Sequence, residues 1–268
     1  MDGVSIIVPT YNGKNKLLNC LNSLVNLNYS SYEIIIVDNN SNDGSIEIIE
    51  SFNKFKIIKN KENLGVAKAT NIGIKNAKYD LILTLDQDVL LEKNCLKELV
   101  KIISKNKSIG IVSPKIFNKT SNNFQGAGFK MSPIIMKTSI IYNVKDILQE
   151  IDYVPGAVVL SRKGIAMMDE DYFLYYSDAQ YSLDIRKKGY KIVYVPKAKA
   201  WHDCNTAEGF TPVRIKHYIK SKLLFAMKNN KHFFLFMLYF YFIYTPVKLF
   251  SFLIRRQFSL SKAYMESI

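Results

Sequence analysis

Cysteine is scarce in this sequence. Cys20, Cys95 and Cys204 stand far apart, their number is odd, and no Cys-x-x-Cys occurs. This usage argues against a disulfide framework and against a zinc site. A reducing compartment fits it best. The N-terminus also lacks a basic region followed by an apolar one, so we expect no signal peptide. No internal repeat is present.

Common nucleotide and calcium motifs are missing as well. No Gly-x-x-x-x-Gly-Lys-Ser/Thr occurs, which excludes a P-loop ATPase. Residues 126–128, Gly-Ala-Gly, lack the third glycine and the strand-turn-helix context of a dinucleotide fingerprint, and we expect a loop there. Residues 38–44 resemble a calcium loop, but the glycine falls one place late. Ile49 also stands where a bidentate Glu is needed, so we reject a calcium site.

Acidic residues are outnumbered by basic ones. The 268 residues include 23 Asp and Glu against 37 Lys and Arg, a formal charge of +14. Such a balance indicates nucleic acid, an anionic membrane surface or a phosphate-bearing substrate as partner. The basic residues gather beside an apolar segment and no RNA- or DNA-binding signature occurs, so we expect no nucleic-acid partner. With 48% hydrophobic and 13% aromatic residues, the chain can bury a sizeable core.

The first hundred residues alternate between strand-like and helix-like apolar patterns. Apolar runs predict strands at residues 4–8, 32–37, 55–58 and 81–85. Helical spacing predicts helices at residues 14–25, 46–52 and 65–77. Strands that alternate with helices of this length predict βαβ units with right-handed crossovers. We therefore expect an α/β fold with a doubly wound, Rossmann-like, mostly parallel sheet flanked by helices.

The second half is less regular. We expect strands at residues 109–113, 156–161 and 192–195, a loop at 118–128, and a helix at 179–188. Trp201 and His202 are expected just after the last of these strands. A basic amphipathic helix is predicted at residues 211–227, followed by an apolar, aromatic run at 233–254.

Two carboxylates follow the buried run at residues 81–85. In extended geometry Asp86 and Asp88, at i and i+2, point to the same side. Two like charges a few Å apart repel unless a cation lies between them, and a hard divalent ion such as Mg²⁺ or Mn²⁺ suits oxygen ligands. The carboxyl ends of strands are where open α/β sheets bind ligands. The alternative is an ordinary acidic turn after a core strand.

Two further side chains have both a structural and a functional interpretation. Asp38 follows the second strand and can accept hydrogen bonds from a base or a ribose, or belong to an Asx-rich turn in which Ser41 or Asp43 caps the next helix. His202 can be a structural or surface histidine. Near a carboxylate pair it can instead be a third metal ligand or a diphosphate contact.

Four motifs in order resemble family-2 inverting glycosyltransferases of the GT-A fold. They are residues 5–12 (SIIVPTYN), residues 33–41 (EIIIVDNNS), Asn63-Leu64-Gly65 with Asn71, and Asp86-Gln87-Asp88. The resemblance continues through Pro155-Gly156-Ala157, residues 173–178 (FLYYSD) and residues 186–190 (RKKGY), and covers about residues 3–205. The later half is similar to rhamnosyltransferase-like members that build cell-surface polysaccharide.

The resemblance implies roles for the matching positions. A nucleotide-sugar donor would be bound by Pro9, Thr10, Tyr11, Asp38, Asn40, Asn63, Gly65, Asn71, Asp86 and Gln87. A Mg²⁺ or Mn²⁺ ion would be held by Asp86, Asp88 and His202. Asp178 would be the general base that deprotonates a hydroxyl of a glycan or lipid-linked acceptor. No Ser-His-Asp set is apparent, and a single in-line displacement needs no Ser or Cys nucleophile.

The chain departs from the family pattern beside this base. Ser177 stands where many members have Glu, and Gln180 stands where another acidic residue often follows. These changes motivate the alternative of a non-catalytic, membrane-anchored scaffold with a nucleotide-sugar fold. Asp178 also has a structural alternative, because Ser177 or Asp178 can cap the following helix. Asp169, Glu170 and Asp171 are then the substitute bases, and Arg186 and Lys187 are near enough in sequence to oppose a raised pKa of Asp178.

The C-terminal residues predict contact with a membrane. Residues 233–254 are long enough to cross one, yet Pro246 and Lys248 interrupt them and three tyrosines favour the interface. Preceding lysines can meet anionic headgroups: Lys216, Lys220, Lys222, Lys228 and Lys231. The alternative is a buried hydrophobic helix pair that closes the core. We expect a catalytic domain at residues 1–210, a membrane-associating segment at 211–268, and a location on the cytoplasmic face of the cell membrane; sequence leaves the oligomeric state open.

Overall fold

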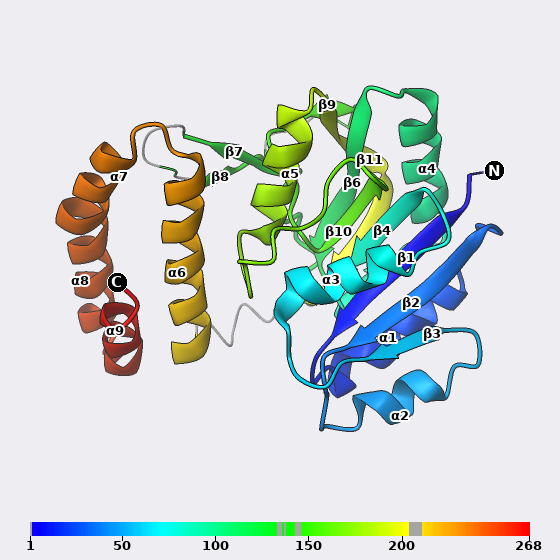
Figure 1. The fold of residues 1–268 in the computed structure, drawn as a ribbon, viewed down its shortest axis with the longest axis horizontal. Coiled ribbons are helices and arrows are strands. Elements are labelled where there is room, and N and C mark those ends of the chain that lie inside the picture. Colours follow the sequence, from blue (N-terminus) through cyan, green and yellow to red (C-terminus); the bar gives the residue numbers. More distant parts are fainter. Residues whose placement is uncertain (1, 133–135, 137, 143–145, 204–210) are drawn as a thin grey trace.

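The computed structural model describes residues 2–132, 136, 138–142, 146–203 and 211–268. It contains a wide central sheet with helices packed on it, and a separate layer of helices formed by the C-terminal residues (Figure 1). The strand order in the main sheet is β3-β2-β1-β4-β10-β6-β11-β5, with β9 paired to β11.

The first half of the sheet is parallel, as the sequence predicts. Its strands are β1 (Val4–Thr10), β2 (Tyr32–Asp38), β3 (Lys56–Lys59) and β4 (Leu81–Leu85). The crossover helices are α1 (Lys14–Val25), α2 (Ser45–Glu50) and α3 (Gly65–Lys75). Because β1 lies between β2 and β4, the chain changes direction across the sheet at β1 and leaves a ligand crevice at the carboxyl ends of these strands.

The second half makes the sheet mixed. The strands are β5 (Val89–Leu91), β6 (Ile109–Asn118), β9 (Gln149–Glu150), β10 (Val158–Arg162) and β11 (Lys191–His202). Strand β10 is antiparallel to β4 and β6, while β11 is parallel to β6 and antiparallel to β5 and β9. The helices here are α4 (Cys95–Lys105) and α5 (Ser177–Lys187), and β7 (Phe129–Met131) pairs with β8 (Thr138–Ile140) in a small second sheet.

Several boundaries differ from the sequence prediction. Strand β11 runs on through a bulge between Val195 and Lys199, so that Trp201 and His202 belong to the strand instead of following it. Strand β10 begins at Val158, two residues later than expected, because the Gly156 N–H bonds to a side chain of α5. Helix α4 was not predicted, although its buried residues recur at helical spacing.

The core forms on both faces of the sheet. Every residue of β4 is 5% exposed or less, as a continuous apolar run in a parallel sheet requires. On one face α1 and α4 contribute leucines to the largest cluster of buried residues. On the other face α3 approaches closely through small residues. A Cβ added at Gly73 would lie 2.3 Å from Ile7 Cγ2, so the glycine sets this spacing.

The C-terminal residues form a layer of their own (Figure 1). It consists of α6 (Pro212–Asn229), α7 (Phe233–Tyr239), the π-helical turn η2 (Phe240–Tyr244), α8 (Thr245–Ile254) and α9 (Phe258–Met265). Thr211 caps α6 by accepting a hydrogen bond from the Arg214 N–H. The π turn ends at Tyr244, two residues before Pro246, whose ring and missing N–H disturb the regular helical bonding, and it accommodates that defect.

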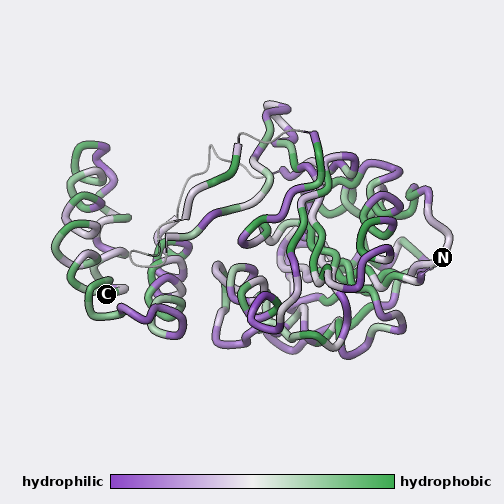
Figure 2. The backbone as a smooth tube through the Cα atoms, turned by 90° about the horizontal axis from the view of Figure 1, so that it is seen from above, coloured by the Kyte–Doolittle hydropathy of each residue, from purple (hydrophilic) through white to green (hydrophobic). Residues whose placement is uncertain are grey.

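The apolar segment Phe233–Ile254 lies largely at the surface. In its most apolar 18-residue window only 17% is buried, and Figure 2 shows that these largely hydrophobic helices stand apart from the sheet. The alternative of a buried helix pair closing the core is therefore wrong. The expected lysine surface needs correction too: Lys222 is buried, while Lys216 and Lys228 are paired with carboxylates, leaving Lys220 and Lys231 exposed.

Helix α6 joins this layer to the sheet region. Ser221 donates a hydrogen bond to the Leu174 carbonyl, and the Asn229 amide donates one to Gln180 Oε1. Lys228 forms ion pairs at 2.6 Å with both Asp169 and Asp171. The predicted domain boundary at residue 210 falls outside the described residues and stays a prediction.

Candidate active site

Asp86 and Asp88 lie in a tight turn between β4 and β5. The Asp86 N–H donates to the Ala157 carbonyl at 3.1 Å, and the Val89 N–H donates back to the Asp86 carbonyl at 3.2 Å. The two carboxylates are therefore not successive same-side groups of an extended strand, as the sequence argument assumed. The turn brings them together instead.

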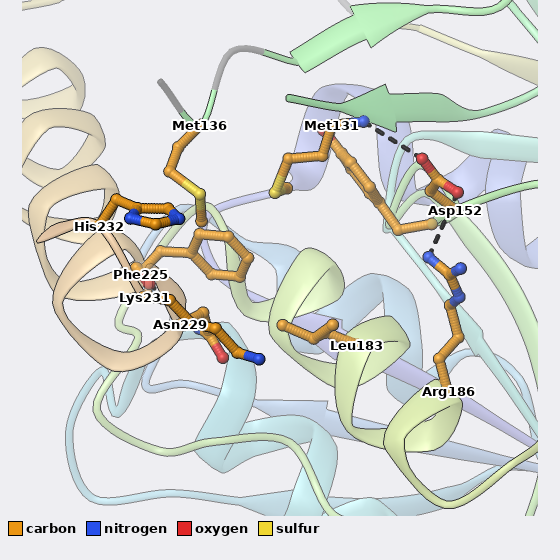
Figure 3. Close-up of a pocket in the computed structure, with 10 residues that line it drawn as sticks. Met131, Met136, Asp152, Leu183, Arg186, Phe225, Asn229, Lys231 and His232 are labelled. Carbon is orange, nitrogen blue, oxygen red and sulfur yellow. Dashed lines mark hydrogen bonds and ion pairs between the residues drawn. The ribbon is translucent and has the colours of Figure 1, made fainter. Parts of the chain in front are cut away.

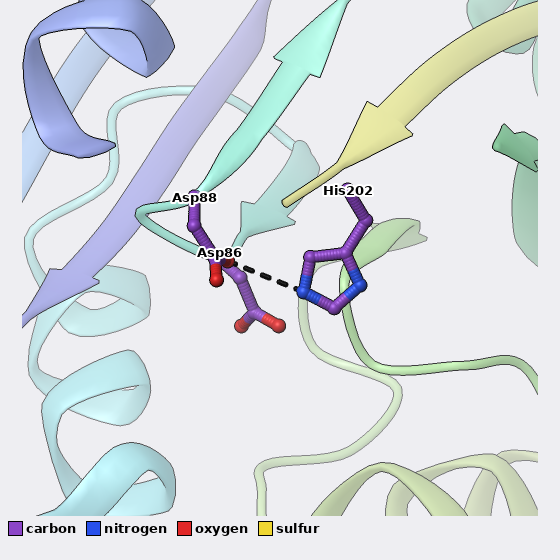
Figure 4. A group of neighbouring side chains, drawn as sticks. All are labelled: Asp86, Asp88 and His202. Atoms are coloured by element: carbon purple, nitrogen blue, oxygen red, sulfur yellow. Dashed lines mark ion pairs between the residues drawn. The ribbon is translucent and has the colours of Figure 1, made fainter. Parts of the chain in front are cut away.

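His202 completes a cluster with these two carboxylates. It stands at the end of β11, opposite Val89 of β5, and its Nε2 is 3.2 Å from Asp88 Oδ1. One ligand atom from each of Asp86, Asp88 and His202 lies within 4.8 Å of the others (Figure 4). The Asp203 N–H also donates to the Asp88 carbonyl, which fixes the end of β11 against the turn. Sequence positions 86, 88 and 202 are thus brought to one point.

Lys16 of α1 is a member of the site that the sequence analysis missed. Its Nζ is 3.6 Å from Asp88 Oδ2 and donates to the Asp203 carbonyl at 2.6 Å. The one signal for it is a lysine in the first turn of the helix that follows β1. It supplies a positive charge beside the carboxylate pair.

The electrostatics of the cluster follow from burial and from these pairings. Burial, with the repulsion of Asp88 and Asp178, raises the pKa of Asp86 to about 6, although His202 opposes it. Burial also favours a raised pKa of Asp88. The hydrogen bond and charge of His202, together with the charge of Lys16, outweigh burial and lower the pKa of Asp88. Burial alone would lower the pKa of His202, but the two carboxylates raise it. One carboxylate is held ionised and the other is disfavoured as an anion until a cation joins it.

This donor set fits a divalent ion. Two carboxylates offer the hard oxygen ligands that Mg²⁺ and Mn²⁺ take, and the imidazole nitrogen suits Mn²⁺ better than Mg²⁺. The raised pKa of Asp86 also indicates a cation site, because a bound cation would favour the ionised form of this buried carboxyl and relieve its repulsion with Asp88.

Asp178 lies across a cavity from this cluster. The cavity has a volume of about 290 Å³. Its lining includes Pro9, Asp86, Asp178 and His202, the strand-end residues Thr84, Leu85, Gly156 and Ala157, and the aromatic side chains of Phe129, Tyr175 and Tyr176. The structure thus places the predicted base and two of the three predicted metal ligands around one space.

The carboxylate of Asp178 is held by backbone donors. Its Oδ2 accepts from the Gly156 N–H and its Oδ1 from the Ala179 N–H, both at 2.9 Å. The helix begins at Ser177 after Tyr176, which has a left-handed φ of 61°, and no side chain caps it. The capping interpretation of Ser177 and Asp178 is therefore wrong. Burial raises the pKa of Asp178, and the two backbone hydrogen bonds oppose that rise.

The other charges that the sequence placed near this base have partners elsewhere. Arg186 bonds to Asp152 at 3.2 Å, and Lys187 lies 3.7 Å from Asp184. The substitute bases are also engaged: Asp169 and Asp171 pair with Lys228, and Glu170 accepts from the Asn71 amide at 2.9 Å. Of the carboxylates named as possible bases, Asp178 lines the cavity and Asp169, Glu170 and Asp171 do not.

Two polar atoms are enclosed at the carboxyl ends of β1 and β2. Thr10 and Asp38 are register partners there. Asp38 Oδ2 accepts from the Ser41 N–H, whereas Asp38 Oδ1 and Thr10 Oγ1 are buried with no hydrogen-bond partner among the described residues. Buried polar atoms are rarely left unpaired, so these two atoms indicate a ligand that donates to them.

The remaining predicted donor contacts hold the surrounding loops. The Gln87 amide pairs with both backbone groups of Tyr11, at 3.0 and 3.1 Å. Asn63 accepts from the Gly65 N–H, and the buried Asn71 bonds to the backbone of Met168. Exposed Asn40 has a left-handed φ of 64°. Of the ten residues predicted to bind the donor, Pro9 and Asp86 line the cavity. The other eight do not, and their contact with a donor stays a prediction: Thr10, Tyr11, Asp38, Asn40, Asn63, Gly65, Asn71 and Gln87.

Gln180, which departs from the family pattern noted in the sequence, makes hydrogen bonds to several other side chains. It accepts from the Tyr172 hydroxyl at 3.2 Å and the Asn229 amide at 2.6 Å, and it donates to Asp184. Gln180 therefore connects α5 to α6 through a hydrogen bond to Asn229. Ser177 is buried in the first turn of α5 and lines the cavity beside Asp178.

A larger cavity of about 400 Å³ lies between α5 and α6 (Figure 3). Its lining is mainly apolar and includes Met131, Met136, Leu183 and Phe225. The one carboxylate among its described lining residues, Asp152, bonds to Arg186 and to the Met131 N–H. This cavity lacks the paired acids of the smaller one, so we place the chemistry in the smaller cavity.

Comparisons with known proteins agree with this geometry. The model of the family described as Glycosyl transferase family 2 matches residues 5–166. A poly-beta-1,6-N-acetyl-D-glucosamine synthase of Staphylococcus epidermidis is 29% identical over 209 residues, which are 75% of this chain and 50% of the relative. The corresponding synthase of Staphylococcus aureus strain MSSA476 is 26% identical over the same shares. The chain thus spans about half the length of the curated relatives it matches.

Solved structures share the fold at lower identity. TarS 1–349 of S. aureus in complex with UDP-GlcNAc is 18% identical, with a TM-score of 0.64 over 97% of this chain and 79% of that one. The mannosyltransferase PcManGT of Pyrobaculum calidifontis, in complex with GDP-Man and Mn²⁺, is 17% identical, with a TM-score of 0.64 over 98% and 73%. GalNAc-T7 with UDP, GalNAc and Mn²⁺ is 19% identical, with a TM-score of 0.67 over 82% and 47%. The expected GT-A fold is confirmed.

Proposed function

The chain belongs to glycosyl transferase family 2, and on that premise we propose that it is a membrane-associated inverting glycosyltransferase. It moves a sugar from a nucleoside-diphosphate sugar to a hydroxyl of a glycan or lipid-linked glycan. One observation carries this proposal: Asp86 and His202, two members of the cluster that also includes Asp88, line the same cavity as the backbone-held carboxylate of Asp178.

The division of labour follows from what each group can do. Inversion is a single in-line displacement, so a base must lie on the side of the sugar away from the departing diphosphate. Asp178, with its raised pKa and two fixed backbone donors, receives the proton of the acceptor hydroxyl. The aromatic walls from Tyr175 and Tyr176 limit water at that carboxylate.

The diphosphate belongs beside Asp86, Asp88 and His202. Asp86, Asp88 and His202 would hold a Mg²⁺ or Mn²⁺ ion, which would neutralise the charge that develops on the departing diphosphate. His202 and Lys16 keep the Asp88 carboxylate ionised and so ready to serve as a ligand. The mixed oxygen and nitrogen donors favour Mn²⁺ of the two ions.

The donor's base is assigned to the ends of β1 and β2. Asp38 Oδ1 requires a donor, and the N3–H of uracil or thymine supplies one, as do the N–H groups of guanine. The names of the relatives, a poly-N-acetylglucosamine synthase and TarS with UDP-GlcNAc, favour uracil and an N-acetylhexosamine. We therefore assign UDP-N-acetylglucosamine as the first donor to test, with a thymidine-diphosphate rhamnose as the competitor that the sequence resemblance suggests.

Membrane association rests on the exposed C-terminal helices. The exposed fractions of Phe234, Phe242 and Phe250 are 74%, 75% and 65%, and they lie on the one apolar helical segment of the described residues that is long enough to span a bilayer. Apolar surface on this scale, next to the exposed Lys220 and Lys231, suits the interface of an anionic membrane. The cytoplasmic face supplies both anionic lipid and nucleotide sugar.

The first experiment is a melting-temperature panel on the wild-type chain. UDP, dTDP, GDP and ADP are each added with and without Mn²⁺, because a ligand stabilises the folded state in proportion to the logarithm of its occupancy. We expect UDP with Mn²⁺ to give the largest shift and the chain to hydrolyse UDP-N-acetylglucosamine slowly without acceptor. Nucleotide binding without hydrolysis of any donor, or transfer to any acceptor pool, would instead favour the scaffold alternative raised by Ser177 and Gln180.

A further inference from the structure

Lys222 of α6 is a buried cation that the proposed reaction does not use. Its side chain lies between α6 and the α7–α8 segment and is 5% exposed. Its Nζ stands 3.6 Å from the ring centroid of Tyr244 in η2. No ion pair joins it to any carboxylate of the described residues. Burial and the neighbouring Lys248 lower its pKa to about 8, so the unliganded protein holds this charge at a disadvantage.

The C-terminal layer offers almost no acid that could compensate it. Residues 211–268 include a single acidic side chain, Glu266, and that side chain pairs with Lys216. The same residues include ten basic side chains: Arg214, Lys216, Lys220, Lys222, Lys228, Lys231, Lys248, Arg255, Arg256 and Lys262. A charge buried without a partner is costly, which points to an anion that comes from outside the chain.

A second cation converges on the same ring. Lys248 of α8 has its Nζ 6.0 Å from the Tyr244 centroid, and its side chain is exposed. The ammonium groups of a buried lysine and an exposed one, contributed by two different helices, thus both lie near the ring of Tyr244. Two ammonium groups around one point can hold a phosphate with charge-assisted hydrogen bonds.

Tyrosines connect this point to the catalytic cavity. Tyr218 shares hydrogen bonds with both Tyr244 and Tyr176. The rings of Tyr176 and Tyr218 are 5.7 Å apart, and Tyr176 lines the cavity that contains Asp178. An anion at the two lysines is thus two aromatic side chains away from the proposed base.

Helix α8, which carries Lys248, also exposes apolar side chains to solvent. Val247, Phe250 and Ile254, on the same helix as Lys248, are 63%, 65% and 67% exposed. A free phosphate would gain nothing from such a surface, whereas the chain of a lipid would bury it. The combination of a buried cation, a second cation and an apolar surface fits an anionic group attached to a lipid.

We propose that Lys222 and Lys248 bind the phosphate of a lipid-linked acceptor and so position its sugar toward the cavity of Asp178. This proposal rests on the proposed glycosyltransferase function and narrows its acceptor to a lipid phosphate or diphosphate. The lipid chain lies along the exposed apolar side chains of α8, and the sugar extends past Tyr218 and Tyr176. Lys222 and Lys248 position the acceptor and take no part in proton transfer.

The test measures binding of dodecyl phosphate to the full chain in dodecyl maltoside micelles. We expect saturable binding to wild type, weakened at least tenfold by Lys222→Gln and threefold to tenfold by Lys248→Gln. Lys262→Gln removes an equally positive, exposed side chain of α9 and is expected to stay within twofold of wild type. Because Lys222 has no carboxylate partner among the described residues, Lys222→Gln should melt no lower than wild type without ligand. The exposed Lys248 supplies a second test that does not disturb the fold.

Other arms separate the sources of phosphate. Inorganic phosphate that displaces dodecyl phosphate at equal concentration would show a site for the free ion and overturn the proposal. Unchanged affinity of Lys222→Gln for dodecyl phosphate would also overturn the proposal. So would a loss of binding seen only with vesicles of phosphatidylcholine and phosphatidylglycerol at 4:1, because the lysines would then contact the membrane surface. Hydrolysis of UDP-N-acetylglucosamine by wild type without lipid tests the proposed function by itself, so the two failures are distinguishable.

Discussion

In the sheet region the apolar side chains lie inside the protein, whereas in the C-terminal helices many lie on its surface. All five residues of β4 are 5% exposed or less, while the most apolar window of Phe233–Ile254 is 17% buried. The two regions also differ in whether their buried charged side chains have partners. Asp88 has His202 and Lys16 beside it and Asp178 has two backbone donors, but Lys222 has no carboxylate partner among the described residues.

This contrast separates a region that is complete by itself from one that needs its surroundings. The sheet region satisfies its own core and most of its polar groups. The exceptions among the described residues are the Tyr194 hydroxyl in β11 and two atoms, Thr10 Oγ1 and Asp38 Oδ1, that lie where we place the donor's base. The C-terminal layer leaves apolar surface and a buried cation uncompensated. We infer that the first region binds a soluble nucleotide and the second a lipid environment.

The largest expected effect is at the metal cluster. Asp88→Ala removes the carboxylate held ionised by His202 and Lys16, so transfer that is sensitive to EDTA should fall to background while the fold is kept. The measurement is transfer rate against Mn²⁺ concentration, with Asp146→Ala, an exposed carboxylate paired with Lys115, as control. Full activity of Asp88→Ala, or a wild type indifferent to EDTA, contradicts the metal assignment.

The next effect is at the proposed base. Asp178→Asn keeps the size and the acceptor oxygen for one backbone donor but cannot take a proton, so transfer should fall ~10²–10⁴-fold with donor affinity nearly unchanged. Single-turnover transfer and UDP affinity are measured side by side. Asp171→Asn, at one of the rejected alternative bases, should stay close to wild type, and a reversal of these two results would move the base to the segment after Met168.

A smaller effect tests the exposed apolar surface. Replacing Phe242 and Phe250 together by Glu should weaken partition into vesicles of phosphatidylcholine and phosphatidylglycerol at least tenfold, because each aromatic side chain contributes ~1.5–3 kcal/mol when buried in lipid. The matched control is Leu18→Glu, which charges a 46% exposed position of α1 in the sheet region. Equal loss in both variants would mean that the two regions do not differ in this respect.

The smallest effect is the pH dependence of Lys222. Its folded pKa of about 8 lies below the unfolded value of 10.5, so between these values the unfolded chain binds more protons at this side chain. As pH rises from 8 to 10.5, the free energy of unfolding of the wild type should therefore increase relative to that of the Lys222→Met variant. Melting temperatures of both proteins across this pH range measure this difference. In the folded state the charge that opposes protonation of Lys222 is that of Lys248. A constant difference would show that Lys222 is not held at a disadvantage.

The sequence by itself determined the βαβ half of the fold. Continuous apolar runs and helical spacing of apolar residues are local sequence patterns. They located β1, α1, β2 and β4 to within one or two residues. The order of the four motifs also indicated candidate side chains for the site, of which Asp86 and Asp88 lie together with His202. The C-terminal apolar run was visible for the same reason, because length and composition suffice to recognise it.

Only the tertiary structure decided how these parts meet. The turn that joins β4 to β5 and the antiparallel pairing of β5 with β11 bring His202 to Asp88 across more than a hundred residues, and no local pattern encodes that register. The same holds for Lys16, which reaches Asp88 from α1. The sequence equally counted Lys222 among surface lysines, since a lysine on an amphipathic helix is normally solvated. Its burial became visible once α6 packed against η2 and α8, because burial depends on which face a second helix covers.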